Sequence, residues 1–127
     1  MRPQIVSRCF AHEVLIREGC FITEVWNSPR DPTLSVARAR LTPHSETRWH
    51  YLDVDERYLI TQGVGTMEVQ GLAPSKVENG DVVVVPAGRL QRIRNTAEGD
   101  LIFYCLCMPR FVPDVYHEPD ESYNPCS

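Results

Sequence analysis

The chain has 127 residues and a mass of 14.5 kDa, which is enough for one domain and too little for two stable ones. Its 13 Lys and Arg residues against 17 Asp and Glu give a net charge of -4 without any basic run, which argues against a nucleic-acid partner. The longest apolar run, residues 101–108, is far shorter than the ~20 residues of a membrane-spanning helix, and the N-terminus lacks a signal-peptide pattern, so we expect a cytoplasmic protein without membrane contact.

Short β-type runs separated by turn residues follow one another along the chain. Residues 11–18 predict one or two helical turns, and strands are expected at 20–27, 34–41, 47–52, 56–62, 66–70, 81–85, 90–94 and 101–108. Asn, Pro and Gly gather in the segments between these strands, as turns require. After Val112, prolines interrupt an acidic tail, which we expect to wrap the outside or be disordered rather than to pair as a strand. The pattern predicts an all-β sandwich or barrel.

The run at 101–108 is apolar on both faces. One face can fill the interior of a small barrel, and the other then needs a second sheet or a second subunit. We therefore expect a homodimer. We divide the chain into an N-terminal arm packing on the barrel (1–33), the barrel itself (34–112) and the tail (113–127).

The five cysteines are odd in number, thinly spread and without a CxxC pair, so a disulfide framework is not expected. Cys105 and Cys107 share one face of a predicted strand. They could hold a soft metal ion, but the apolar strand around them favours small apolar fillers that stay reduced.

Polar residues at regular spacing occupy two segments in the middle of the chain. The first runs from His44 to Gly63 and contains His50 and Glu56; the second runs from Gly80 to Asn95 and contains Pro86, Gly88 and Gln91. Both resemble the paired motifs of the cupin superfamily, usually written G(x)5HxH(x)3-4E(x)6G and G(x)5PxG(x)2H(x)3N. The resemblance covers residues 34–111 and implies an all-β double-stranded β-helix, the jelly-roll barrel of cupins.

The motifs also depart from the family pattern at three positions. Metal-binding cupins hold a divalent ion with two histidines and a glutamate of the first motif and one histidine of the second. Here Leu52 replaces the second histidine and Gln91 replaces the histidine of the second motif. The resemblance leaves His50, Glu56 and Gln91 as tentative ligands of one divalent metal ion, with water or substrate completing the shell. His44 replaces a glycine and is expected in a turn with positive φ, outside the pocket.

The same residues also support a site without metal. If His50 and Glu56 lie side by side in an apolar pocket, the carboxylate orients the imidazole, and the pair can act as general acid or base. Gln91 would fix a polar group of the ligand. Further substrate-binding residues are expected on the same strand faces, namely Leu52, Tyr58, Ile60 and Ile93. A third alternative is a buried polar pair without any ligand.

The resemblance does not select a reaction, because cupins include dioxygenases, isomerases, lyases and binding proteins. We expect a pocket inside the barrel for a small polar metabolite, in an enzyme that a metal could assist. The alternative is a metal-free ligand-binding or regulatory protein without turnover. The scattered arginines, Arg38 and Arg40 among them, could recruit an anion but are expected to pair with Asp and Glu.

Overall fold

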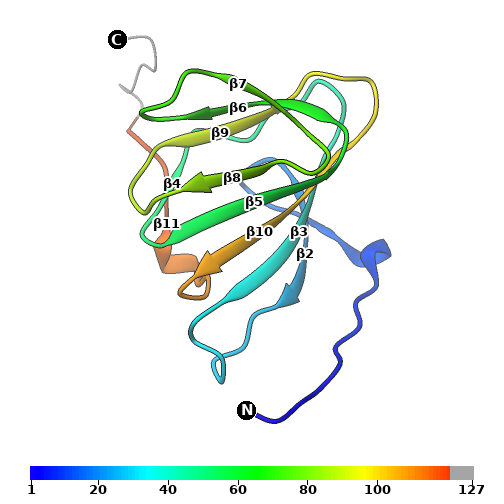
Figure 1. Cartoon of the computed structure of the whole chain (residues 1–127), viewed down its shortest axis with the longest axis vertical. Coiled ribbons are helices and arrows are strands. Elements are labelled where there is room, and N and C mark those ends of the chain that lie inside the picture. The colour runs from blue at the N-terminus through cyan, green and yellow to red at the C-terminus, as the bar shows by residue number, and fades with distance from the viewer. Residues whose placement is uncertain (121–127) are drawn as a thin grey trace.

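The computed structural model describes residues 1–120, and these form two antiparallel sheets packed face to face (Figure 1). The larger sheet has the strand order β1 (Val14–Leu15), β2 (Phe21–Trp26), β3 (Ser35–Leu41), β10 (Leu101–Met108), β5 (Asp55–Gln62) and β8 (Val82–Val85). The smaller sheet has the order β7 (Ser75–Glu78), β6 (Val64–Val69) and β9 (Gln91–Asn95). A short ribbon joins β4 (Tyr51–Leu52) to β11 (Tyr116–His117). The all-β prediction is confirmed.

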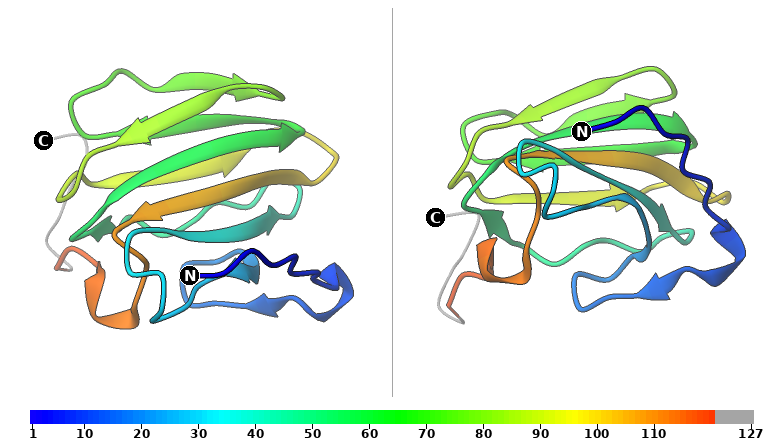
Figure 2. Two further views of the ribbon diagram at one scale, coloured as in Figure 1. Left: turned by 60° about the horizontal axis from the view of Figure 1, so that its bottom comes forward. Right: turned by 90° about the horizontal axis from the view of Figure 1, so that it is seen from below.

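The remaining described elements are two short 3-10 helices, η1 (Phe10–His12) and η2 (Pro113–Val115). The N-terminal segment runs beside β2, where Nε of Arg8 donates to the carbonyl oxygen of Glu24 at 2.9 Å (Figure 2). Within the described residues, no helix has the length and apolar character needed to cross a membrane.

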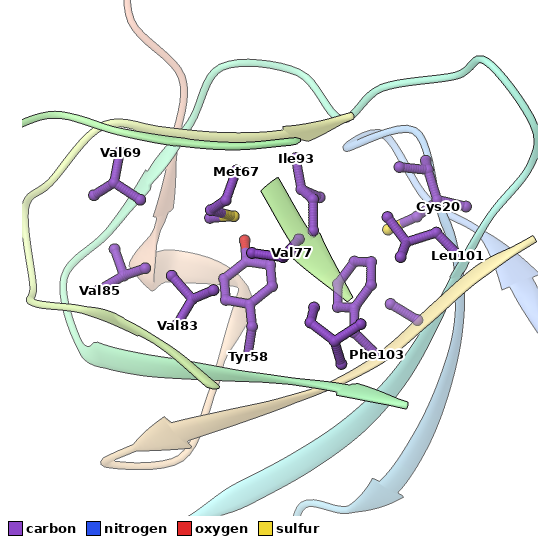
Figure 3. Close-up of a cluster of buried hydrophobic side chains, with 13 residues drawn as sticks. Cys20, Tyr58, Met67, Val69, Val77, Val83, Val85, Ile93, Leu101 and Phe103 are labelled. Carbon is purple, nitrogen blue, oxygen red and sulfur yellow. The ribbon is translucent and has the colours of Figure 1, made fainter. Parts of the chain in front are cut away.

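The core lies between the two sheets and follows from strict alternation along the strands. Glu56, Tyr58 and Ile60 of β5 alternate with more exposed residues and are buried. Met67 and Val69 of the smaller sheet lie across the interior from Tyr58 (Figure 3). The ring of Tyr58 stacks on that of Phe103 with centroids 5.2 Å apart. This apolar cluster fills much of the space between the sheets.

β10 lies at the centre of the larger sheet, between β3 and β5. Its inward residues belong to the core, whereas Tyr104 and Leu106 on the outer face are only half-buried in the single chain. Outward side chains on the neighbouring edge are more open, since Val82 and Val84 are 59% and 53% exposed. The expected homodimer is a proposal that these apolar side chains motivate.

The turn from β5 to β6 depends on Gly63, the glycine that closes the first motif. Its φ is 88°, in the region that favours glycine. A Cβ atom here would lie 2.5 Å from the carbonyl oxygen of Asp100, so a larger residue would be both strained and obstructed. The prediction for His44 is confirmed as well: its φ is 59° and its exposed ring contacts Glu98 at 2.8 Å.

Three local predictions were wrong. Residues 11–18 form no further helical turn after η1, because Val14 pairs with Ile22 as the start of β1. Of the strand expected at 47–52, only β4 forms regular strand pairing. At Thr47 the side-chain hydroxyl, and not a backbone carbonyl, accepts the hydrogen bond from the amide of Ile93 at 2.9 Å, which interrupts the strand. The tail was expected not to pair, yet Tyr116 pairs with Leu52. β7 was not predicted, because this polar edge strand lacks an apolar pattern.

Candidate functional site

Small side chains on two neighbouring strands leave a cavity beside Glu56. Ser35 and Ala37 of β3 lie opposite Cys107 and Cys105 of β10 and share their inward face. Because none of the four fills the space between the sheets, a cavity of about 130 Å³ remains beside them. Its other lining residues are Ile16, Glu18, Ile22, Glu24, Leu52, Glu56 and Phe111.

Glu56 is the buried acid of this cavity, with only 6% of its surface exposed. Its Oε1 atom accepts a hydrogen bond from Nε2 of Gln91 at 2.9 Å, and the thiol of Cys105 is a second hydrogen-bond partner. The carbonyl oxygen of Gln91 accepts in turn from the hydroxyl of Tyr58. Burial, with the charge of Glu18 as a further cause, raises the pKa of Glu56 to about 8. This carboxyl can therefore gain or lose a proton near neutral pH.

His50 is fully enclosed, and its contacts are with other groups. Its Nδ1 atom lies 2.7 Å from the carbonyl oxygen of Arg48, which can only accept, so Nδ1 carries a hydrogen. Its Nε2 atom lies 3.4 Å from Oε1 of Glu18. The other oxygen of Glu18 lies 3.6 Å from the Sγ atom of Cys20. Glu18 therefore connects the His50 ring to the wall of the cavity.

The C-terminal segment covers His50. The ring of Tyr116 stacks on the imidazole with centroids 5.5 Å apart, and its hydroxyl donates to Glu118 at 2.7 Å. Arg17 and Arg48 both donate to the same carboxylate. The hydrogen bond from Arg17 is the largest cause that lowers the pKa of Glu118 to about 2. These contacts hold the segment in place over the ring.

The structure brings together some of the predicted site residues and separates others. Glu56, Gln91 and Tyr58 form one hydrogen-bonded chain, and the backbones of His50 and Gln91 pair at 2.8 and 3.1 Å. His50 and Glu56 do not form the expected side-by-side pair. The carboxylate beside the imidazole is that of Glu18.

The predicted pocket floor also needs correction. Leu52 lines the cavity as expected. Ile60, Ile93 and Tyr58 instead belong to the packed apolar core, where large side chains from both sheets interdigitate (Figure 3). Gln91 is 1% exposed and acts by holding Glu56. The expected pocket therefore lies nearer to β2 and β3 than the motif spacing suggested.

Sequence reasoning missed Glu18 and Glu24, which line the cavity from the segment around β2. The sequence did contain a signal for them. In an extended segment, residues 18, 22 and 24 lie on the same face as residue 20, which is the buried Cys20. Because residues 11–18 were predicted to be helical, the two-residue period of a strand was not applied to Glu18.

The donor set does not fit the divalent ion that many cupins hold. Within residues 1–120, no three His, Cys, Asp or Glu side chains are grouped closely enough to bind a metal ion. Of the tentative ligands, His50 directs Nδ1 to a carbonyl and Nε2 to Glu18, and the amide oxygen of Gln91 already accepts from Tyr58. Leu52 offers no donor at all.

The arginines and cysteines singled out in the sequence lie outside this site or serve as its packing. Arg40 forms ion pairs with Glu13 and Asp100, and Arg92 pairs with Glu68, as expected for these arginines. Cys9, Cys20, Cys105 and Cys107 are free thiols, and Cys126 lies outside the described residues. Burial raises the pKa of Cys105 and of Cys107, which keeps both protonated and fits the expected role as fillers.

Comparison with known proteins gives structural neighbours only. No protein-family model and no curated protein sequence matches the chain. A Cupin 2 conserved barrel domain protein from Salinispora arenicola is 16% identical, with a TM-score of 0.73 over 85% of this chain and 90% of that one. An RmlC-like cupin family protein from Methanocaldococcus jannaschii, with a double-stranded β-helix fold, is 16% identical with a TM-score of 0.68 over 87% and 94%.

A predicted oxalate decarboxylase from Thermotoga maritima is similar to the chain as well. It is 20% identical, with a TM-score of 0.72 over 84% of this chain and 99% of that one. Identities this low show the fold alone. The chain has the double-stranded β-helix fold of cupins, and the fold prediction is confirmed.

Proposed function

We propose that this cupin-fold chain binds a small polar molecule in the cavity beside Glu56 and that the Glu56 carboxyl exchanges a proton with it. The observation that carries the proposal is the place of Glu56, which lines a cavity of about 130 Å³ and has only 6% of its surface exposed. Concave sites with apolar walls and a few polar groups are the usual form of small-molecule sites.

The surroundings of Glu56 support acid–base chemistry at this position. Its pKa of about 8 is close to neutral pH, where general acids and bases work best. The Gln91 amide, itself held by Tyr58, fixes one carboxyl oxygen. The carboxyl is therefore oriented before the ligand arrives.

A binding protein without turnover is the second candidate, and one observation favours it. His50, the other expected acid–base group, does not line the cavity and is enclosed by Arg48, Glu18 and Tyr116. A single carboxyl could then serve recognition alone. A metal-assisted reaction finds no support in the donor set.

A ligand search with a blocked cavity tests the proposal. Native mass spectrometry would look for a co-purified ligand, and a library of small polar fragments would be titrated by NMR. The variant Ala37→Leu extends a side chain into the cavity, whereas Ala87→Leu changes an exposed alanine and serves as the matched control. We expect binding to the wild type and to Ala87→Leu, with at least tenfold weaker binding to Ala37→Leu. Fragments that bind Ala37→Leu equally well, or none that bind the wild type, would refute it.

A further inference from the structure

We infer that the ligand of this cavity is a small organic cation, an alkylammonium group on a short apolar body. The inference rests on the proposed function, because it names the chemical class of the molecule that the Glu56 cavity takes. It draws on the charges, the walls and the size of the cavity.

The charges on the cavity wall are unbalanced. Three carboxyl groups line it, those of Glu18, Glu24 and Glu56, and none of its described lining residues is Lys, Arg or His. Glu18 has a partner in His50 behind the wall. Glu56 is different, since its hydrogen bonds come from the neutral Gln91 amide and the Cys105 thiol.

A buried carboxyl without an opposite charge is unusual, because burial penalises its ionised form. Glu56 lines the cavity, and its hydrogen-bond partners Gln91 and Cys105 carry no such charge. An ammonium group in the cavity would supply it and would donate hydrogen bonds to the carboxylate. Glu24, which is more exposed, would add attraction toward the positive group.

The same wall disfavours the other two ligand classes. An anionic ligand would bring a like charge next to Glu18, Glu24 and the ionised Glu56, which is unfavourable in a poorly solvated site. A neutral ligand could accept or donate hydrogen bonds but would leave the charge of the carboxylates uncompensated. We therefore expect the charge of a ligand to be the main factor that decides how tightly it binds in the cavity.

The apolar part of the wall defines the rest of the ligand. Ile16, Ile22, Leu52 and Phe111 provide apolar surface around the carboxyl groups. The ring of Phe111 can also contact a cation favourably. A volume of about 130 Å³ corresponds to roughly four water molecules at ~30 Å³ each. This space suits an ammonium group with a chain of about three carbons.

Three probes of similar size and different charge test the class: propylammonium, 1-propanol and propionate. Each would be titrated into the full chain at pH 9, where Glu56, with its pKa of about 8, is ionised and propylammonium is still charged, with NMR shifts at Ala37 and Cys105 as the readout. We expect propylammonium to bind at least tenfold more tightly than 1-propanol, and propionate to show no saturable binding. Equal binding of propylammonium and 1-propanol, or preferred binding of propionate, would overturn the inference.

Variants of the carboxyl groups assign the effect to the cavity. Glu56→Gln keeps the shape and the hydrogen bond to Gln91 but removes the charge, and should weaken propylammonium binding at least tenfold. Glu24→Gln, at a more exposed position, should weaken it about threefold and remains informative if the first variant does not fold. Glu78→Gln, on β7 and away from the cavity, should leave it within twofold of the wild type. Unchanged binding to both cavity variants would refute the cation site.

The outcome separates this inference from the proposed function. If neutral fragments bind the wild type and lose affinity in Ala37→Leu, while propylammonium does not bind, the ligand class is wrong and the cavity remains a binding site. If no probe and no fragment binds the wild type, the proposed function fails together with the inference.

Discussion

His50 and Glu18 form a buried pair, with Nε2 of the imidazole 3.4 Å from Oε1 of the carboxylate. Nδ1 donates to the carbonyl of Arg48, so the two ring nitrogens face oxygen atoms of two different segments. The pair joins the turn before β2 to the segment before β4, a connection that the amide of Arg48 strengthens by donating to the carbonyl of Glu18 at 2.8 Å. The contacts of Glu18 therefore fix the position of the turn before β2, which forms part of the cavity wall.

Removing the carboxylate of this pair should destabilise the protein. Glu18→Ala leaves the enclosed imidazole without its partner, and we expect a loss of roughly 2 kcal/mol in the free energy of unfolding. Urea denaturation measures it. Glu98→Ala breaks the exposed pair with His44 and is the matched control, with an expected change below about 0.5 kcal/mol. Equal losses in the two variants would contradict the importance of the buried pair.

Glu56 should make stability fall as the pH rises. Its pKa in the fold, about 8, lies above the ordinary value of 4.5, so its contribution is fully present below pH 4.5 and is lost as the pH rises toward 8. Glu56→Gln cannot ionise, and should gain on the order of a few kcal/mol relative to the wild type between pH 5 and 9. Thermal melts of both proteins across this range check it. A pH-independent difference between them would show that Glu56 ionises normally.

Glu118 should behave in the opposite sense. Its pKa of about 2 lies below the ordinary 4.5, so its contribution is present above pH 4.5 and is lost as the pH falls through about 2. Glu118→Gln should loosen the segment over His50 at neutral pH. It should speed exchange of the Tyr116 amide, which donates to the carbonyl of Pro113, and of the Asp53 amide, which donates to that of Val115. Exchange in β6 should not change. Wild-type protection at Tyr116 in the variant would refute this role.

The donor set predicts a low metal content. Elemental analysis of protein prepared without a histidine tag should find less than about 0.1 divalent ion per chain, because the candidate ligands do not converge. Near-stoichiometric metal that disappears in both His50→Ala and Glu56→Ala would instead establish a metal site.

The apolar edge of the larger sheet predicts a homodimer. Val82, Val84 and Leu59 lie together on its outer face and are exposed in the single chain. Val84→Lys should shift sedimentation from dimer to monomer at micromolar concentration, because a buried interface does not tolerate an unpaired ammonium group. Val14→Lys changes an equally exposed residue on β1, at the opposite edge of the same sheet, and should leave the dimer intact. A wild type that sediments as a monomer would refute the prediction.

The sequence by itself determined which residues point inward and where the chain turns. Alternation along β5 placed Glu56, Tyr58 and Ile60 on the inner face, and the motif glycine Gly63 marked the bend into β6. These features depend on neighbours along the chain, through the two-residue period of a strand and the φ angles open to glycine. The double-stranded β-helix could therefore be predicted from the motif spacing.

Only the tertiary structure decided which polar groups meet. Glu18 reaches His50 because β2 pairs with β3 and the turn before β2 lies against the segment before β4. The cavity exists because small residues of β3 and β10 come into register, and the large side chains of Tyr58, Ile60 and Ile93 fill the space that spacing alone assigned to a ligand. Spacing along a strand specifies the face on which a side chain lies. The partner across the interior depends on how distant segments pack, which no local pattern encodes.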